Sequence, residues 1–213
     1  MNPLVSVIIN CYNSQQYLSE AIESVINQTY NNLEIIIWDN KSSDNTKKIV
    51  DNYNDERIKY FISETHTNLS TARHNAILSS AGQWFAFLDS DDVWEKEKLF
   101  NHIEIINKNN NIGLSFSQCK IIRGNKVYSV KENIYIDRYL RENKNLFEIL
   151  LKGNFIFISS VIFKKKLYTK DIYINSFLEY AEDYDLLLNY SKISNYNYVN
   201  KKLVYYRIHS NNL

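Results

Sequence analysis

Apolar residues alternate between short continuous runs and helical spacing along the first 92 residues. Strand-like runs occupy residues 5–9, 33–38, 58–62 and 84–88. Between these runs, apolar positions recur every three or four residues, which indicates amphipathic helices. This β-α-β-α-β-α-β order predicts an α/β fold of Rossmann-like type, with a mostly parallel central sheet and helices on both faces. The nearly unbroken apolar runs agree, because parallel strands are buried on both sides.

The pattern is less regular after residue 92. Helical spacing predicts helices over residues 99–106, 145–152 and 181–193, and apolar runs predict strands over 112–117, 160–163 and 203–207. A hairpin turning at Gly124 and Asn125 is expected between them. We expect one domain over residues 1–213, with a regular half (1–92) and a smaller, mixed half (93–213).

Charge and composition exclude several classes of protein. The 213 residues carry 25 Lys and Arg against 24 Asp and Glu, so the net charge of +1 predicts no nucleic-acid partner. Cys11 and Cys119 are too few and too distant for a disulfide framework, which favours a reducing compartment. No signal peptide is visible, and the longest charge-free apolar stretch, 153–163, is shorter than the roughly 20 residues of a membrane span. These features predict a cytoplasmic protein.

Polar side chains follow three of the expected strands at the point where each strand ends. Tyr12 and Asn13 follow the first, Asp39 ends the second, and residues 89–92 (Asp, Ser, Asp, Asp) follow the fourth. Ligands of open α/β sheets bind beyond the carboxyl ends of the strands, so these residues define a candidate site. Asp39 has an alternative role in a turn.

The acidic segment carries the strongest chemical signal. Asp89 and Asp91, two residues apart, can reach one cation, and carboxylate oxygens suit Mg²⁺ or Mn²⁺. Such a metal would bridge phosphates and neutralise a departing diphosphate. Asp92 either contacts the ligand or caps the helix that follows.

Four further residues each have a functional and a structural interpretation. Arg73 either binds phosphate or pairs with an acid. Glu182 and Asp183 either face the site, with Asp183 taking a proton from an attacking hydroxyl, or stabilise the start of a helix. His209 is either a metal ligand or an ordinary histidine. No glycine-rich phosphate loop is present, which argues against P-loop and dinucleotide-binding proteins.

Taken together, these motifs resemble family-2 glycosyltransferases, the large inverting family with the GT-A fold. The resemblance covers nearly the whole chain in ordered motifs: residues 5–13, Tyr17 and Leu18, Ser24, 28–30, 34–39, 42–46, 68–75, Gly82, 87–92, Glu182 and Asp183, and 206–209. It implies a GT-A domain with a nucleotide-binding half (1–92) and an acceptor-binding half (93–213). It also implies transfer of a hexose or N-acetylhexosamine from a nucleoside diphosphate sugar, UDP by default, to an acceptor hydroxyl.

The resemblance implies a role for each matching residue on the donor side. Tyr12, Asn13 and Asp39 would hold the nucleoside, with Asp39 facing the base. Arg73 would lie near the nucleotide.

On the catalytic side, Asp89 would contact ribose or the metal, and Asp91 would bind Mn²⁺ or Mg²⁺. His209, and with it Arg207, would help hold the metal or the diphosphate. Asp183 would be the general base of a single displacement with inversion.

The chain departs from the family pattern in two places. Asn10 stands where Pro is usual, and Asn40, Lys41 and Ser42 stand where a second Asp, Gly and Ser are common. The chain also stops at Leu213, whereas many relatives continue with C-terminal helices, so it is either a minimal version or a truncated one.

The acceptor expected from the family is a saccharide or lipid-linked saccharide of bacterial surface polysaccharide or glycolipid assembly. The lysine runs 164–166 and 201–202 either attract an anionic membrane, for peripheral contact at the inner face of the plasma membrane, or form a solvated surface. A non-catalytic nucleotide-sugar or carbohydrate-binding module on the same fold is the alternative function.

Overall fold

A computed structural model describes residues 2–124, 126–129, 140, 142 and 145–210 of the chain. Strands and helices alternate regularly in the first half: β1 (Val5–Cys11), α1 (Leu18–Ile26), β2 (Leu33–Asp39), α2 (Thr46–Asp51), β3 (Ile58–Ile62), α3 (Leu69–Leu78) and β4 (Trp84–Phe87).

The second half mixes short and long elements. They are β5 (Val93–Trp94), α4 (Lys98–Ile106), β6 (Ile112–Arg123), β7 (Lys126–Ser129), α6 (Leu146–Leu150), η1 (Ile158–Ser160), β8 (Ile162–Lys164), η2 (Lys165–Leu167), α7 (Glu182–Ile193) and β9 (Asn195–Ile208).

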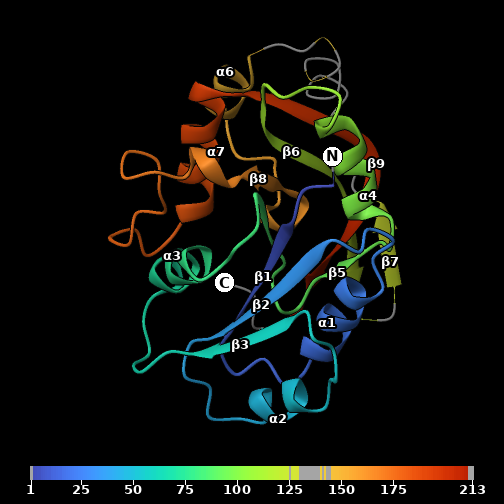
Figure 1. Ribbon diagram of the computed structural model, residues 1–213, viewed down its shortest axis with the longest axis vertical. Coiled ribbons are helices and arrows are strands. Elements are labelled where there is room, and N and C mark those ends of the chain that lie inside the picture. Colours follow the sequence, from blue (N-terminus) through green and yellow to red (C-terminus); the bar gives the residue numbers. More distant parts are fainter. Residues whose placement is uncertain (1, 125, 130–139, 141, 143–144, 211–213) are drawn as a thin grey trace.

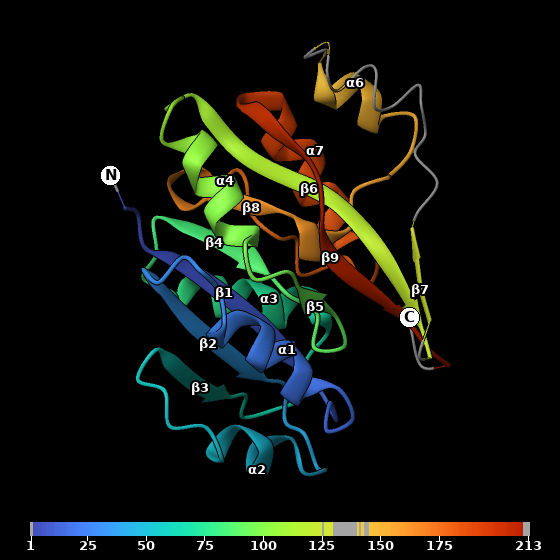
Figure 2. The ribbon, with the colours of Figure 1, turned by 90° about the vertical axis from the view of Figure 1, so that its right-hand side faces the viewer.

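All nine of these strands join one twisted sheet, in the order β3-β2-β1-β4-β8-β6-β9-β5, with β7 paired to β6. Strands β1 to β4 pair in parallel. Strand β8 is antiparallel to both β4 and β6, whereas the long strands β6 and β9 are parallel to each other (Figure 2). The expected α/β class with a mostly parallel sheet is therefore confirmed, and the antiparallel pairings fall in the second half.

Two apolar cores lie on opposite faces of the sheet. Along β1, Val7 and Ile9 face a core with α1 and α4, while Ile8 between them faces a core with α3, α6 and α7. Side chains alternate between the two faces of a strand, so an unbroken apolar run supplies both cores. Figure 1 shows α1 and α4 on one side of the sheet, and α3, α6 and α7 on the other.

Two of the expected strands begin at residues other than those predicted. Ser160 ends the short 3₁₀ helix η1, and the following strand begins at Ile162. Strand β9 begins at Asn195, eight residues before the predicted start. The expected hairpin is present as the antiparallel pair β6 and β7, with Gly124 at a φ of 55°, while Asn125 lies outside the described residues.

Candidate active site

The parallel strands β1, β2 and β4 end at one edge of the sheet, at Cys11, Asp39 and Phe87. The loops that follow carry the residues singled out in the sequence. Backbone pairing in register therefore gathers these residues at a single edge.

The first two of these loops are tied together by hydrogen bonds. The N–H of Asn13, a residue in the left-handed region at a φ of 50°, donates to Ser42 Oγ over 2.9 Å. In return, Asn13 Oδ1 accepts from the N–H of Ser43 over 2.9 Å. Ser14 donates its N–H to Thr46 Oγ1, also over 2.9 Å. The turn after β1 is thereby fixed against the loop after β2.

Asp39 is buried beneath this loop, at 1% exposure. Its Oδ1 accepts from the N–H of Ser42 over 2.7 Å, and its Oδ2 accepts from the hydroxyl of Tyr60. Burial and this hydrogen bond raise the pKa of Tyr60, so the phenol remains the donor. Asp39 thus stabilises the loop that follows β2, at the expected nucleoside site.

Two residues of the second departure from the family pattern, Asn40 and Lys41, have clear local consequences. Asn40 donates its amide to Thr67 O over 2.6 Å and accepts from Thr67 N over 3.1 Å. An aspartate could accept but not donate in this pair. Lys41 adopts a φ of 68°, in the left-handed region that favours glycine. Its Nζ donates to Glu64 O over 2.7 Å.

Tyr12 stands at the rim of the edge, 51% exposed, with its ring centroid 4.1 Å from that of His66. His66 is not among the candidate residues named from the sequence, because its spacing to the other histidines forms no motif. Together the two rings offer an aromatic surface beside the loops after β1 and β2.

Asp89, Asp91 and His209 form the acidic edge of the site. His209 Nε2 lies 2.8 Å from Asp91 Oδ2, which joins the two residues that the family resemblance made metal ligands. Burial, and after it the charge of Asp89, raises the pKa of Asp91, while the contact with His209 lowers it. Two partly buried carboxylates that repel each other are a site where a divalent cation would be favourable.

Asp92 does not cap a helix, which corrects one of its two interpretations. Helix α4 starts only at Lys98, and Asp92 is 1% exposed. Its Oδ1 accepts from the N–H of Arg207 over 2.9 Å, and its Oδ2 from Ser159 Oγ over 2.6 Å. Burial, followed by the charge of Asp89, raises the pKa of Asp92. Asp92 therefore fastens β9 and the η1 segment to the end of β4.

Arg207 binds its own chain at several points. Its Nε donates to Asp91 O and its terminal nitrogen to Glu20 Oε2, both over 2.7 Å. The guanidinium also lies 4.4 Å from the centroid of the Tyr17 ring. The centroid of the Tyr17 ring is in turn 5.1 Å from that of the His209 ring. These contacts hold the end of β9 against α1 and the acidic segment.

Arg73 pairs with two acids, which favours the second of its two interpretations. The side chain is 4% exposed and bridges Asp89, over 2.6 Å, and Glu182, which is itself buried. The guanidinium also lies 5.2 Å from the centroid of the Phe87 ring. Burial raises the pKa of Glu182, whereas the charge of Arg73 lowers it. Burial is the larger effect, so the pKa of Glu182 is raised overall.

Asp183 opens on a cavity of about 240 Å³ that it shares with Asp89, Asp92 and Tyr206. Burial, and after it the charges of Asp92, Asp89, Asp91 and Asp183, raises the pKa of Tyr206. All four carboxylates therefore act on one phenol. The expected base and the expected metal acids are brought to the same place.

The cavity also has walls that the sequence analysis missed. Residues 154–159 line one side, and Ser159 Oγ donates to Asp92 as well as accepting from the N–H of Asp89 over 3.1 Å. Phe157 packs on Tyr206, with ring centroids 4.7 Å apart. Residues 154–159 read as an apolar segment without motif, so only the fold reveals their position.

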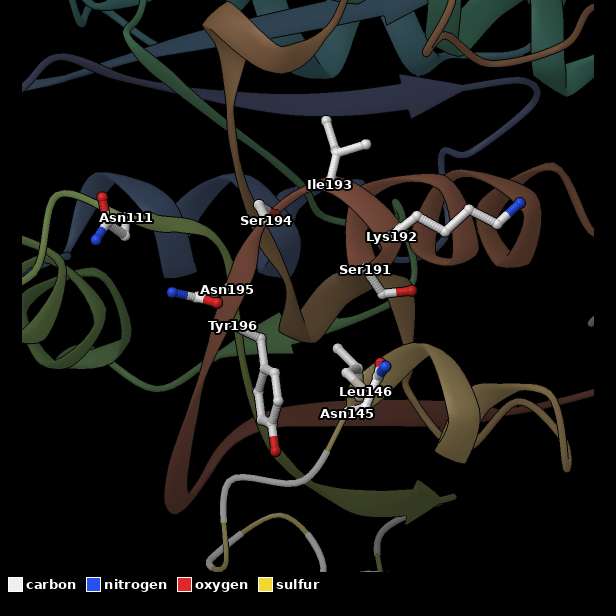
Figure 3. A pocket seen from close by; sticks show the side chains of 9 residues that line it. All are labelled: Asn111, Asn145, Leu146, Ser191, Lys192, Ile193, Ser194, Asn195 and Tyr196. Carbon is white, nitrogen blue, oxygen red and sulfur yellow. The ribbon is translucent and has the colours of Figure 1, made fainter.

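A second cavity, of about 680 Å³, has none of the acids of the candidate site in its lining (Figure 3). The cavity lies at the start of β9 and the end of α7. It contains no carboxylate and is lined by Asn111, Asn145, Leu146, Ser191, Lys192, Ile193, Ser194, Asn195 and Tyr196. Several of its polar groups already have partners within the chain, among them Asn145, Ser191 and Ser194. The cavity at Asp183 is therefore the candidate active site.

The described residues contain no ready-made cluster of three or more His, Cys, Asp or Glu side chains able to hold a metal. Asp89, Asp91 and His209 nevertheless supply the hard oxygen and imidazole donors that Mn²⁺ accepts. None of the described helices is long and apolar enough to cross a membrane.

Comparison with known proteins identifies the family. The model of "Glycosyl transferase family 2" matches residues 6–177. An Escherichia coli protein, UDP-Glc:alpha-D-GlcNAc-diphosphoundecaprenol beta-1,3-glucosyltransferase WfgD, is 33% identical over 200 residues, which are 92% of this chain and 73% of that protein. An uncharacterized glycosyltransferase of Rickettsia typhi, RT0329, is 32% identical over 98% of this chain and 65% of its own length.

Solved structures share the fold. Residues 1–349 of S. aureus TarS in complex with UDP-GlcNAc match with a TM-score of 0.79 at 22% identity, over 98% of this chain and 59% of that one. The mannosyltransferase PcManGT from Pyrobaculum calidifontis, in complex with GDP-Man and Mn²⁺, matches with a TM-score of 0.77 at 16% identity, over 99% and 59%. The chain thus spans about three fifths of these structures. Because the family model matches most of the chain and relatives above 30% identity cover more than nine tenths of it, the protein belongs to glycosyl transferase family 2 and is a glycosyltransferase.

Proposed function

We propose that this glycosyltransferase moves a hexose or an N-acetylhexosamine from a UDP-sugar to a hydroxyl of a saccharide or lipid-linked saccharide, with inversion at the anomeric carbon. The observation that carries the proposal is the cavity at which Asp183 and Asp89 meet, beside Asp91 and His209. This arrangement would place Asp183, the proposed base for the acceptor hydroxyl, next to Asp89 and Asp91, the proposed ligands on the donor side. The UDP-GlcNAc complex of a structural neighbour and the UDP-Glc in the name of the E. coli relative support a UDP donor.

The donor would lie along the edge formed by the first half of the chain. The ring pair of Tyr12 and His66 offers a surface on which a nucleobase can stack. The turn at Asn13 and the loop above Asp39 would enclose the nucleoside. The second half would receive the acceptor against residues 154–159 and Tyr206.

Asp89, Asp91 and His209 would hold Mn²⁺ or Mg²⁺, with His209 moving off Asp91 to do so. When bound, the cation would neutralise the charge of the departing diphosphate. The Mn²⁺ of a structural neighbour supports this choice.

The chemical step requires a base on the acceptor side. In the proposed reaction, a carboxylate oxygen of Asp183 takes the proton of the acceptor hydroxyl as that oxygen bonds to the anomeric carbon. The bond between this carbon and the diphosphate oxygen breaks on the opposite face, and the electron pair leaves with UDP. One displacement inverts the configuration. The alternative of a non-catalytic module is disfavoured because Asp183 opens directly on the cavity.

The name of the E. coli relative, which specifies a saccharide on a lipid diphosphate, supports the proposed acceptor class. We place the reaction in bacterial surface polysaccharide or glycolipid assembly, at the inner face of the plasma membrane. The chain spans about three fifths of its structural neighbours, so acceptor and location are proposals for the whole protein.

The test is transfer from UDP-Glc and UDP-GlcNAc to a GlcNAc-diphospholipid analogue, with Mn²⁺ present, followed by UDP release and mass spectrometry of the product. We expect one donor to give a product one sugar heavier, with loss of turnover in EDTA. Asp91→Ala should lower kcat by about 10²-fold or more, since each 1.4 kcal/mol of lost transition-state stabilisation costs about tenfold.

Asp51→Ala is the matched control, because the ion pair of Asp51 with Lys47 on α2 is exposed to solvent. It should turn over like the unaltered protein. Normal turnover by Asp91→Ala would remove the metal assignment. No product with either donor would remove the proposed substrates.

A further inference from the structure

We propose that Arg73 is a positioning residue of the transfer: it joins the donor acid Asp89 to Glu182 and thereby fixes the neighbouring Asp183 against the donor. The family resemblance places Arg73 near the nucleotide instead. The proposal rests on the proposed function, since it assumes that Asp183 acts on the acceptor.

The contacts of Arg73 span three elements. The residue lies on α3, while Asp89 follows β4 and Glu182 begins α7, which is 109 residues further along the chain. One terminal nitrogen binds each carboxylate, and the side chain is 4% exposed. Arg73 Nε has no hydrogen-bond partner among the described residues. The two ion pairs are therefore made by the two terminal nitrogens of the guanidinium.

Among the described residues, the first turn of α7 makes polar contacts to α3 through Glu182 and to α6 through Tyr184, whose hydroxyl donates to Leu150 O. Its N-cap residue, Ala181, adopts a left-handed φ of 60° and gives no side-chain cap. Helices usually gain a cap from Ser, Thr, Asp or Asn at this position. Glu182 is the first helical residue and is 4% exposed, so its ion pair with Arg73 is a buried polar contact that ties the first residue of the helix to α3. Asp183 is the next residue, and its direction follows from that turn.

Helix α3 also holds the segment before α7. Ser70 Oγ donates to Leu178 O, and Asn68 Nδ2 donates to Ser176 O over 2.8 Å. The beginning of α3 therefore guides the chain towards Ala181 from two further positions. Arg73, one turn later on α3, completes the connection at the site itself.

An arginine suits this role better than a lysine. Two carboxylates from different elements must be bound at the same time, and a planar fork offers a separate nitrogen to each. The Phe87 ring, 5.2 Å away, supports the guanidinium from β4. A single ammonium group would favour one acid over the other.

The experiment separates positioning from nucleotide binding. Arg73→Met and Arg73→Lys are compared with the unaltered protein for UDP affinity by calorimetry and for kcat in the transfer assay with UDP-Glc or UDP-GlcNAc. We expect Arg73→Met to lower kcat by about 10²-fold, as a small misplacement of reacting groups does, while the Kd for UDP changes less than about threefold. Arg73→Lys should recover part of the kcat loss.

A second measurement does not depend on activity. Hydrogen exchange at residues 182–186 should be faster in Arg73→Met, because the first turn of α7 loses its ion pair with α3. Glu182→Gln should lower kcat with unchanged UDP affinity. In the double variant of Arg73→Met and Glu182→Gln, the fold-decrease in kcat should be smaller than the product of the two single decreases, because both residues act through the same ion pair.

Arg57→Lys is the matched control, because the half-buried Arg57 also binds a carboxylate, that of Asp55, through its fork, just before the start of β3. It should leave kcat unchanged. Weaker UDP binding with unchanged kcat in Arg73→Met would make Arg73 a nucleotide contact and overturn the proposal, as would additive losses in the double variant. An unaltered protein that turns over neither donor refutes the proposed function instead.

Discussion

At the scale of single residues, Asp183 has two competing explanations. It lies in the first turn of α7, where three acids face the positive end of the helix dipole. Acids there stabilise a helix by about 0.3–1 kcal/mol each, whatever their function. Yet Asp183 also lines the cavity with Asp89, whereas a purely stabilising acid needs no cavity. Substitution distinguishes the two accounts.

Asp183→Asn preserves the shape of the side chain and removes the base. We expect kcat to fall by about 10²–10⁴-fold, the usual contribution of a positioned base, with UDP affinity nearly unchanged. Steady-state kinetics and calorimetry measure the two quantities. Asp185→Asn is the control on the same helix, because the hydrogen-bond donor to Asp185 among the described residues is Asn189, one turn away, over 3.2 Å. A slightly lower melting temperature with intact transfer would favour the dipole account.

The residues at the strand ends could be predicted from the sequence because parallel pairing must bring them together. Asp39, Asp89 and Asp91 each follow an apolar run, and the order of elements alone predicts a common edge. Ser159 and Tyr206 could not be found in this way. They reach the cavity through β8 and β9, whose places in the sheet depend on pairing between distant segments.

At the scale of elements, the start of β9 shows where pattern recognition ends. The strand begins at Asn195, but Asn197, Asn200, Lys201 and Lys202 interrupt the apolar alternation until Leu203. The polar part pairs with β6 through register irregularities between Ser117 and Cys119. Backbone hydrogen bonds to a long partner maintain this part of the strand, which side-chain periodicity does not reveal.

Helix α4 contains a buried lysine that should reduce stability. Lys98 is fully buried, its Nζ has no hydrogen-bond partner among the described residues, and it lies 4.0 Å from the centroid of the Trp94 ring. Burial lowers the pKa of Lys98 to about 7, against partial compensation from Cys119. The neighbouring His102 is also buried, and its pKa is lowered by burial and by Lys98.

The direction of the pH effect follows from proton binding. Between about pH 7 and pH 10 the unfolded chain keeps a proton on Lys98 that the folded chain has lost, so stability rises with pH. From pH 7 to pH 9 this residue should add about 2 kcal/mol to the free energy of unfolding. Below pH 7 both states are protonated, and the full cost of burial is present.

Lys98→Met should remove both the cost and its pH dependence, because the thioether keeps the contact with Trp94 without a charge. We expect the free energy of unfolding at pH 7 to rise by about 1–3 kcal/mol, and the gain from pH 7 to pH 9 to shrink relative to the unaltered protein. Urea unfolding at both pH values provides the measurement. Lys48→Met, at an exposed position on α2, should change stability by less than about 0.5 kcal/mol. A destabilised Lys98→Met protein would mean that the amine has a partner worth more than its burial costs.

At the scale of the whole molecule, the lysine runs do not surround the active edge. Lys164 pairs with Trp84 at the beginning of β4, opposite to the end that carries the acids. Lys164 Nζ donates to Asn110 O over 2.6 Å, and Lys165 Nζ donates to Ser80. Lys201 donates to Asn101 over 2.7 Å. These lysines therefore bind the protein's own backbone and side chains, which favours the interpretation of a structural, solvated surface.

One sheet runs through both halves of the chain, and this continuity should make the halves unfold together. Strand β8 joins β4 of the first half to β6 of the second, and Asp92 fastens β9 to the end of β4. A ligand bound at the edge of β1, β2 and β4 is therefore expected to stabilise the whole chain. UDP with Mn²⁺ at about 100 times its Kd should add about 2.7 kcal/mol to the free energy of unfolding. For a chain of this length that corresponds to a rise of about 5–10 °C in Tm.

Scanning calorimetry should show a single transition that moves as a unit, and hydrogen exchange should slow at α1 and at α7 alike. EDTA should remove most of the shift, because Asp89 and Asp91 would then face the diphosphate without a cation between them. UMP, which lacks the second phosphate, is the control ligand and should give a smaller shift that EDTA barely changes. Two separate transitions, with only the first moved by UDP, would mean that the second half folds independently of the donor site. In that case the acids and Asp183 would be coupled by their local contacts rather than by the sheet.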